Sequence, residues 1–347
     1  MHILHALFTH VQGGLGQAHV NTTEALIAKG HQVTALMHPD SPYCGAVTAL
    51  GAQLVTIKPT GFYDVFAVWK MRRLLKQLRP DIIVAHNSRA IALLSLAAKG
   101  TGIAVCGVSH SYKTARTKRA DSLVVLSEHM RQNFIRGGYT KHIDVIPNFI
   151  HLPEMPSMPA FRKPVVIGSI GRFTPEKGFD DLICALGELK QMGVAFVARL
   201  GCDGEERAKL EALSKKLGLT DCLHFDGWIK DAKAFYKELD IFCLPSLEES
   251  FPLVILEALA YGVPIVATDT PGPITMLSDN VTGVLVPRGD VKAMAKALQR
   301  LATQPDMAAR MAEAGWQRVQ SYGFSAVADL WDAALKNLIS DGDPSKR

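Results

Sequence analysis

The sequence predicts an α/β protein made of two doubly wound domains. Three observations lead to this prediction: a length of 347 residues, an alternation of short apolar runs with helical patterns, and one proline-rich interruption. At roughly 150 residues per domain, the chain is long enough to bury two hydrophobic cores. Strands that alternate with helices in this way form βαβ units and parallel sheets.

The first half of the chain contains seven runs of strand length separated by helical patterns. The first helix is expected to end at Lys29-Gly30, because glycine readily adopts the positive φ angle that follows many helices. The expected strands are 2–8, 32–37, 53–57, 81–86, 103–108, 122–126 and 143–146, and the expected helices are 17–29, 65–78, 89–99 and 128–136.

Residues 151–164 interrupt the pattern with four prolines in 14 residues. Proline has no amide hydrogen to donate to a helix or a strand ladder, so we expect a linker here between domains 1–150 and 165–323. The pattern then resumes and ends with an amphipathic helix near 324–339. The expected strands are 165–170, 194–200, 222–225, 240–244, 264–268 and 283–286, and the expected helices are 179–191, 204–217, 231–238, 253–261, 290–303 and 305–319.

The composition narrows the class of protein. An apolar fraction of 48% with 20% charged residues is typical of a globular chain. No stretch approaches 18 uninterrupted apolar residues, and the first residues lack the basic region of a signal peptide, so neither a membrane span nor a leader is expected. The six cysteines form no C-x-x-C pair, which predicts reduced thiols in a cytoplasmic protein and no structural zinc.

The net charge of +5 is unevenly distributed along the chain. Residues 1–163 carry a net charge of +10, and residues 164–347 carry −5. A basic first half suggests an anionic partner, which could be a phosphate, a membrane surface or a nucleic acid. No nucleic-acid-reading motif accompanies the charge, so nucleic acid is the least favoured of the three.

A glycine-rich turn joins the first expected strand to the first helix. Gly13, Gly14 and Gly16 would allow a ligand to approach the backbone, and the helix N-terminus would offer amides to a phosphate. The alternative is an ordinary turn that needs glycine for its geometry. The spacing is not G-x-G-x-x-G, which argues against a dinucleotide-dependent dehydrogenase.

Two cations follow the first strand of the second domain. Arg172 and Lys177 flank a turn in Gly171-Arg172-Phe173-Thr174-Pro175-Glu176-Lys177-Gly178, at the carboxyl end of a strand. A planar guanidinium and a compact ammonium together suit a diphosphate. The alternative is a pair of solvated surface charges.

Two glutamates eight residues apart mark the segment 245–268. Glu257 lies in an otherwise apolar helix, so it needs a partner, either ligand hydroxyls or a protein group. Glu249 lies in the loop before that helix. The amides of Phe251, Leu253 and Val254 could bind phosphate at the helix start.

These motifs together resemble the retaining nucleotide-sugar glycosyltransferases of the GT-B fold, family 4 (glycosyl transferases group 1). The resemblance spans nearly the whole chain and includes Glu249 and Glu257 with Gly171-Arg172 and Lys177-Gly178 upstream. It implies two Rossmann-like domains facing across a cleft, a nucleotide sugar held mainly by the second and an acceptor by the first. It also implies that the C-terminal helix, about 324–340, packs back on the first domain. Further matching segments are Gly13-Gly14, Gly30-His31-Gln32-Val33, Ile146-Pro147-Asn148, Gly201-Cys202-Asp203-Gly204 and Gly227-Trp228-Ile229 with Asp231.

The resemblance also implies roles for single residues. Arg172 and Lys177 would bind the donor diphosphate and stabilise the leaving group, and Glu257 would bind the ribose. The donor sugar would meet Glu249 and His110, a histidine at a strand end for which His86 is an alternative that the sequence does not separate. The remaining expected donor contacts are Gly13, Gly14, Ile229 and the amides of Phe251, Leu253 and Val254.

The sequence departs from this family at two places. Gly272-Pro273-Ile274-Thr275 stands where the family often has Gly-x-x-Glu, so an acidic contact is missing. Asn148-Phe149-Ile150 replaces the commoner Asn-Gly-Val-Asp, which implies a different local conformation near the expected linker.

The expected function is that of a metal-independent retaining glycosyltransferase without a cofactor. A UDP-sugar is the first choice of donor, and the acceptor would be a glycan or glycolipid of the bacterial envelope. Residues 62–79 mix aromatics with five cations, and Lys113, Arg116, Lys118 and Arg119 add a second cluster. This basic half could rest on an anionic membrane, or the cations could simply be solvated. A sugar-nucleotide epimerase and a non-catalytic nucleotide-sugar-binding subunit are the alternatives.

Overall fold

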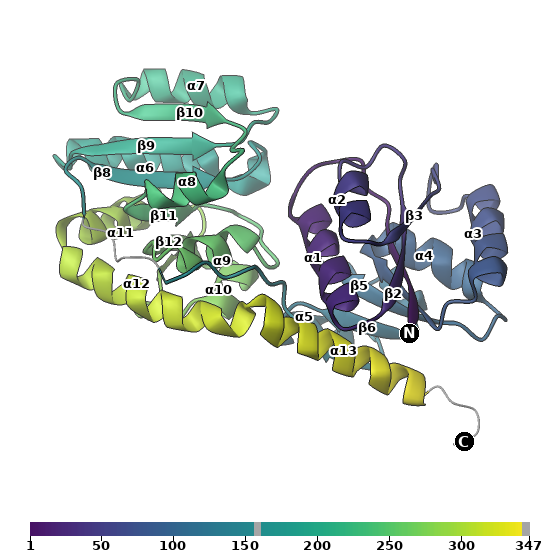
Figure 1. Cartoon of the computed structure of the whole chain (residues 1–347). Helices are drawn as coiled ribbons and strands as arrows, with labels where there is room; N and C mark the ends of the chain where they lie inside the picture. The colour runs from purple at the N-terminus through teal and green to yellow at the C-terminus, as the bar shows by residue number, and fades with distance from the viewer. Residues whose placement is uncertain (156–160, 342–347) are drawn as a thin grey trace. The chain divides into compact units, whose positions relative to one another are not determined.

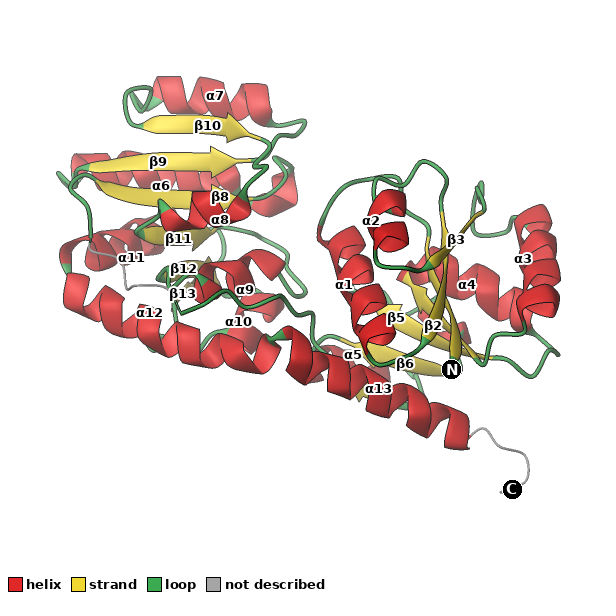
Figure 2. Ribbon diagram, in the orientation of Figure 1, coloured by secondary structure: helices red, strands yellow, loops and turns green. Residues whose placement is uncertain are grey.

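A computed structural model describes residues 1–155 and 161–341. The chain divides into two compact units, one formed by Met1–Ile150 with the chain from Tyr322 onward, the other by His151–Ser321. Each unit has one parallel β-sheet and its own hydrophobic core (Figure 1, Figure 2). The predicted α/β class with two parallel-sheet domains is therefore confirmed. Residues 156–160, which belong to the expected linker 151–164, lie outside the described part.

The sheet of the first unit contains seven described strands in the order β3-β2-β1-β4-β5-β6-β7, all parallel. The strand order reverses between β1 and β4, and ligands of open parallel sheets bind at such a point, beyond the carboxyl ends of the strands. Leu7 at the end of β1 pairs with His86 at the end of β4. The strands are β1 (His2–Leu7), β2 (Gln32–Met37), β3 (Gln53–Thr56), β4 (Ile82–His86), β5 (Ala104–Ser109), β6 (Ser122–Val125) and β7 (Ile143–Val145).

The C-terminal helix α13 belongs to the first unit and packs beside α1. Trp331 and Leu335 of α13 join the apolar core of this unit together with Leu26 of α1. Just beyond α1, His31 contacts Asp332 of α13 at 3.1 Å. The helices are α1 (Gly14–Ala28), α2 (Cys44–Ala49), α3 (Val65–Leu78), α4 (Asn87–Ala98), α5 (Glu128–Arg136) and α13 (Phe324–Asp341), with a 3-10 turn η1 at Thr117–Arg119.

The second unit repeats the plan with six described parallel strands in the order β10-β9-β8-β11-β12-β13. Helix α6 packs beside α11, and α9 packs beside α12. The strands are β8 (Val165–Ile170), β9 (Phe196–Gly201), β10 (Leu223–Gly227), β11 (Ile241–Leu244), β12 (Ile265–Thr268) and β13 (Val284–Val286). The helices are α6 (Phe179–Gln191), α7 (Arg207–Lys216), α8 (Ala232–Lys237), α9 (Leu253–Ala260), α10 (Pro271–Met276), α11 (Val291–Thr303) and α12 (Pro305–Val319), with 3-10 turns η2 (Pro175–Lys177) and η3 (Gln320–Tyr322).

The structure differs most from the predicted elements at four helices, α1, α2, α7 and α10. Helix α7 begins at Arg207 rather than at residue 204. Helix α1 begins at Gly14 rather than at residue 17, because the Gly13 carbonyl accepts bonds from the amides of Gly16 and Gln17. Helices α2 and α10 were not predicted. Each is a single short helix of six residues that contains glycine or proline, so it shows no apolar periodicity in the sequence.

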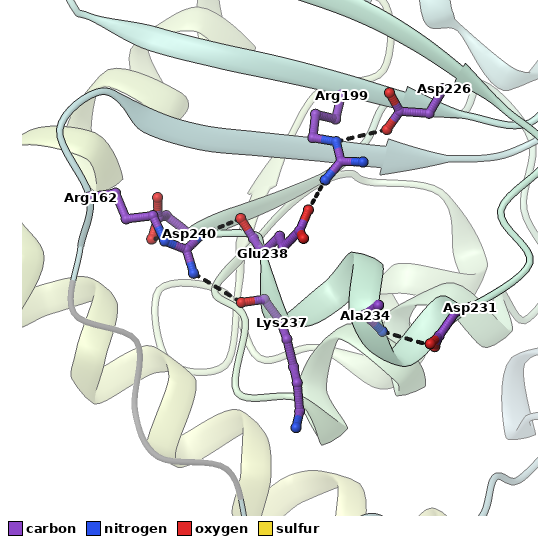
Figure 3. Close-up of polar contacts among 8 residues, drawn as sticks. All are labelled: Arg162, Arg199, Asp226, Asp231, Ala234, Lys237, Glu238 and Asp240. Atoms are coloured by element: carbon purple, nitrogen blue, oxygen red, sulfur yellow. Dashed lines mark hydrogen bonds and ion pairs between the residues drawn. The ribbon is translucent and has the colours of Figure 1, made fainter.

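Charged residues connect neighbouring strands of the second sheet, some at its amino-terminal edge and some within it (Figure 3). The Arg162 guanidinium, just before β8, donates to the carbonyls of Lys237 and Glu238, which precede β11. The buried carboxylate of Asp240 accepts a hydrogen bond from the Val166 amide at 2.8 Å. Arg199 on β9 binds Asp226 on β10 at 2.8 Å. The contacts of Arg162 and Asp240 join β8 and β11 at the edge opposite the carboxyl ends, whereas the Arg199–Asp226 pair joins β9 and β10 within the sheet.

Candidate active site

Two loops at the carboxyl ends of β8 and β11 lie against each other in the second unit. The backbone amide of Leu247, after β11, donates to the carbonyl of Glu176, in η2, at 2.9 Å. Gly178 has φ 62°, and a Cβ there would lie 2.3 Å from the Pro245 carbonyl oxygen. Only glycine therefore allows these two loops to approach so closely.

This approach joins two of the residues singled out in the sequence. The Lys177 ammonium lies 2.5 Å from Glu249 Oε1, and the Ser246 hydroxyl donates to the same oxygen at 3.2 Å. Both side chains of the ion pair are mostly shielded from solvent, with 22% of Lys177 and 13% of Glu249 exposed. The sequence treated Lys177 and Glu249 as separate donor contacts, whereas the structure shows that they form a pair.

Arg172 precedes Lys177 by five residues, in the loop after β8, and its side chain is exposed. Among the described residues, its guanidinium has no hydrogen bond or ion pair. The backbone of the same turn is fixed by the loop after β9, because the Phe173 amide donates to the Asp203 carbonyl at 3.0 Å. A Cβ on Gly204 would lie 2.4 Å from the Phe173 carbonyl oxygen, so glycine is required there as well. The turn is held in place while the Arg172 side chain remains available to an anion.

Glu257 projects from α9 and has a protein partner that the sequence did not identify. The Tyr236 hydroxyl, from α8, donates to Glu257 Oε2 at 2.8 Å. Tyr236 is fully buried and stacks on Tyr261, with ring centroids 5.7 Å apart. Burial raises the pKa of Glu257, and the Tyr236 hydrogen bond acts in the opposite direction. Twenty-one residues separate the two groups, so no local pattern could have paired them.

The start of α9 and the end of β9 provide the remaining predicted contacts of the second unit. Leu253 and Val254 occupy the first turn of α9, where amides have no partner within the helix, and Phe251 precedes it in the chain. Gly272 packs against this start, since a Cβ there would lie 2.7 Å from Pro252. Ile229 covers Gly201 at the end of β9, where a Cβ would meet the Ile229 side chain at 2.6 Å.

In the first unit, the glycine-rich turn is occupied by a tyrosine that the sequence analysis missed. The Tyr43 hydroxyl accepts from the Gly13 amide and donates to the Gly13 carbonyl, both at 2.8 Å. A Cβ on Gly16 would lie only 2.0 Å from the Tyr43 ring. The backbone groups of Gly13 are thus bonded to the protein, and the next residue, Gly14, begins α1. The alternative interpretation, glycine required for turn geometry, accounts for Gly13 and Gly16.

The two histidines that the sequence could not separate are bonded to each other. His86 Nδ1 lies 3.0 Å from His110 Nε2. His86 is fully buried at the end of β4, whereas His110, just after β5, is partly exposed. Both border a cavity of about 10 Å³, which has room for about one water molecule. Of the two, only His110 is partly accessible to solvent.

Comparisons with known proteins bear on the family and the fold of the chain. Residues 12–153 match the family model described as Glycosyltransferase Family 4, and residues 154–318 match the one described as Glycosyl transferases group 1. The lipopolysaccharide core biosynthesis glycosyltransferases LpsD and LpsE of Rhizobium meliloti (strain 1021) are each 27% identical. The alignments cover 95% of this chain and 97% of LpsD, and 92% of this chain and 94% of LpsE.

Solved structures share the fold of the whole chain. Anabaena HepE, crystallised in complex with UDP and glucose, superposes with a TM-score of 0.86 at 18% identity, covering 97% of this chain and all of HepE. The apo lipopolysaccharide outer core galactosyltransferase WaaB superposes with a TM-score of 0.81 at 18% identity, covering 97% of this chain and 99% of WaaB.

Proposed function

Since the chain belongs to the glycosyl transferases of group 1 and has their GT-B architecture, we propose that it transfers a sugar from a UDP-sugar to a glycan or glycolipid of the bacterial envelope. The transfer proceeds without a metal ion and with retention of the anomeric configuration. The observation that carries this proposal is the grouping of Arg172, Lys177 and Glu249 beyond the carboxyl ends of β8 and β11.

The donor diphosphate is assigned to the two cations. Arg172 is exposed and unpartnered among the described residues, so its guanidinium can bind two phosphate oxygens side by side. Lys177 is already held in place by Glu249, which reduces the freedom it would lose on binding. Fixed cations stabilise the negative charge that develops on the leaving diphosphate, which is the chemistry a transferase requires.

The nucleoside is assigned to Glu257 and Ile229. Tyr236 holds one carboxylate oxygen of Glu257, Oε2, and so orients the carboxylate, whose other oxygen can accept hydrogen bonds from ribose hydroxyls. Ile229 offers an apolar surface above Gly201 for the base. The choice of UDP is supported by the fold likeness to HepE, which was crystallised with UDP and with UDP-glucose.

The contacts of Glu249 support attack on the same face of the sugar, with retention of the anomeric configuration. Its Oε1 is engaged by Lys177 and Ser246, so we assign Glu249 to positioning the donor sugar and not to covalent attack. His110 is assigned to the sugar as well, as the partly exposed member of the histidine pair. The envelope acceptor is supported by the printed names of LpsD and LpsE.

We propose that the protein meets its acceptor at an anionic membrane surface, at the cytoplasmic face. Phe66 and Trp69 of α3 are 82% and 59% exposed, and the Arg73 guanidinium lies 6.0 Å from the Trp69 ring centroid. Trp69, Arg73 and Lys76 are three to four residues apart and share one side of the helix. Aromatics beside cations suit the boundary between lipid headgroups and acyl chains. Among residues 1–155 and 161–341, no helix is long and apolar enough to cross a bilayer.

Vesicle sedimentation tests the membrane assignment. A Phe66→Ser/Trp69→Ser double variant is expected to lose binding to vesicles that contain phosphatidylglycerol. Leu330→Ser, which changes an apolar residue that is 46% exposed on α13, is the control and should bind as the wild type does. Equal binding of all three proteins would remove α3 as the contact surface.

Calorimetric titration tests the donor. The purified chain is titrated with UDP, GDP and ADP in EDTA, and then with magnesium. Binding of UDP in EDTA supports the proposal, whereas binding of another nucleotide alone reassigns the base. Binding that requires magnesium contradicts metal independence, and donor-only interconversion of UDP-sugars would indicate an epimerase.

A further inference from the structure

Four histidines from separate elements gather inside the first unit. His5 lies on β1, His19 on α1, His86 at the end of β4 and His110 just after β5. His5, His19 and His86 are fully buried. The rings of His5 and His19 stack with centroids 4.0 Å apart, so His19 covers one face of His5. Within the described part of the chain, no three His, Cys, Asp or Glu side chains are placed to hold a metal ion.

Three of these rings form a continuous chain of hydrogen bonds. His5 Nδ1 lies 2.8 Å from the Thr23 hydroxyl, and His5 Nε2 lies 2.8 Å from His86 Nε2. His86 then contacts His110 Nε2 through its Nδ1 at 3.0 Å. This series of hydrogen bonds therefore runs from Thr23 on α1 across β1 and β4 to His110. It uses five of the six ring nitrogens of the three histidines.

All three rings are neutral at neutral pH, because burial disfavours the charged form. Burial lowers the pKa of His110 to about 4 and lowers the pKa of His5 and His86 well below the ordinary value of 6.5. A neutral imidazole carries one N–H and one bare nitrogen. Each ring can therefore donate one hydrogen bond and accept one. The hydrogen bonds between Thr23 and His110 must then all be donated in the same direction along the series.

Thr23 determines that direction. Its hydroxyl hydrogen is donated to the His19 carbonyl at 2.9 Å, so its oxygen accepts from His5 Nδ1–H. His5 Nε2 is then bare and accepts from His86 Nε2–H, and His86 Nδ1 is bare and accepts from His110 Nε2–H. The opposite direction would use the Thr23 hydrogen for His5 and would lose the bond to the His19 carbonyl. It therefore has one hydrogen bond fewer.

We propose that Thr23, His5 and His86 are positioning residues that fix His110 in the tautomer with its proton on Nε2, which leaves Nδ1 as a hydrogen-bond acceptor for a ligand hydroxyl. Nδ1 of His110 has no partner among the described residues, and it is not among their fully buried, unpaired polar atoms, so it keeps access to solvent. Only the identity of the hydroxyl, that of the donor sugar, rests on the proposed function. An acceptor nitrogen requires the hydroxyl to donate and orients it accordingly.

Nitrogen-15 NMR of the full chain, labelled at histidine, tests the proposal without any ligand. The wild type is expected to show His5 protonated on Nδ1, and His86 and His110 protonated on Nε2. Scalar couplings across the two N–H···N bonds should connect His110 Nε2 with His86 Nδ1, and His86 Nε2 with His5 Nε2. A His110 proton on Nδ1 in the wild type would overturn the proposal, and no variant is needed for that result.

Two matched variants test the role of Thr23. Thr23→Val has nearly the same shape but leaves His5 Nδ1–H without an acceptor, so the chain should reverse and the His110 proton should move to Nδ1. Thr23→Ser keeps the hydroxyl and should retain the wild-type pattern. An unchanged His110 tautomer in folded Thr23→Val would show that Thr23 does not set the direction.

Activity supplies a separate readout with UDP-glucose as the probe. Thr23→Val should lower kcat about tenfold, the value of one hydrogen bond, with KM changed by less than about threefold. Thr23→Ser should restore kcat. Equal loss in both variants would indicate a packing defect and would contradict the positioning role. If wild-type protein does not consume UDP-glucose, glucose is not the transferred sugar, while the NMR result still decides the tautomer.

Discussion

Glu249 Oε1 lies 2.5 Å from the Lys177 ammonium, so the carboxylate occupies part of the space around the cation that we assign to the donor diphosphate. A carboxylate in this position repels an incoming phosphate while it holds the lysine in place. Binding of the donor must therefore redistribute the lysine's hydrogen bonds between two anions.

Glu249→Gln separates these two effects. The amide keeps the shape and one acceptor oxygen but removes the negative charge, so UDP affinity should rise about threefold to tenfold. Turnover of the UDP-sugar should fall, because the sugar loses its charged contact. Calorimetry with UDP and a steady-state assay measure the two quantities on the same preparation. A loss of UDP affinity in this variant would contradict the arrangement.

Tyr236→Phe removes the hydroxyl that orients Glu257. The variant should be less stable by about 1 kcal/mol, because a partly buried carboxylate loses its hydrogen bond. UDP should bind more weakly, while inorganic diphosphate should bind as to the wild type. Urea denaturation and calorimetry provide the two measurements. Equal weakening for both ligands would place the effect outside the ribose contact.

Gly178→Ala should separate the loops that follow β8 and β11. Its Cβ would lie 2.3 Å from the Pro245 carbonyl oxygen, in addition to the cost of φ 62°. Gly218→Ala is the matched control, because Gly218 has φ 66° and open space at the Cβ position. We expect a loss of about 1 kcal/mol for the control and at least about twice that for Gly178→Ala. Similar melting temperatures for the two variants would show that the loops do not need this contact.

Buried histidines make the folded state sensitive to acid. Burial lowers the pKa of His19 to about 3, and among the described residues both of its ring nitrogens are buried without a hydrogen-bond partner. Below about pH 6.5 the unfolded chain binds a proton at this residue that the folded chain excludes, so stability falls as the pH decreases. The loss for each such histidine is about 1.4 kcal/mol per pH unit down to its folded pKa.

His19→Leu isolates this contribution. The apolar side chain removes two unpaired nitrogens and one titrating group, so the variant should be as stable as the wild type at pH 8 and more stable at pH 5. Denaturation curves at a series of pH values measure the difference. A variant that loses stability in parallel with the wild type between pH 6.5 and 4 would contradict the assignment.

The sequence predicted well those features that depend on neighbouring residues along the chain. Apolar runs located all thirteen strands of the described structure to within about two residues, since a buried parallel strand is a short continuous apolar segment. Arg172 and Lys177 were singled out because they lie in the loop after a strand, and the carboxyl ends of parallel strands are where ligands bind.

Contacts between distant residues could not be predicted in the same way. Lys177 and Glu249 are 72 residues apart, and Thr23 is 18 residues from His5. Their meeting depends on strand order and on how closely two loops approach. Gly13 shows the same limit, because a glycine that serves a ligand and a glycine that accommodates Tyr43 look alike in a sequence.

The most direct test of the donor assignment is calorimetric titration of UDP in EDTA into the wild type and into an Arg172→Ala/Lys177→Ala double variant. Circular dichroism confirms folding, and uridine, which lacks the diphosphate, is the control ligand. The account predicts that the double variant binds UDP at least about thirtyfold more weakly, at roughly 1 kcal/mol or more per charge-assisted contact, while uridine binding changes by less than about twofold. A folded double variant that binds UDP as tightly as the wild type would contradict it.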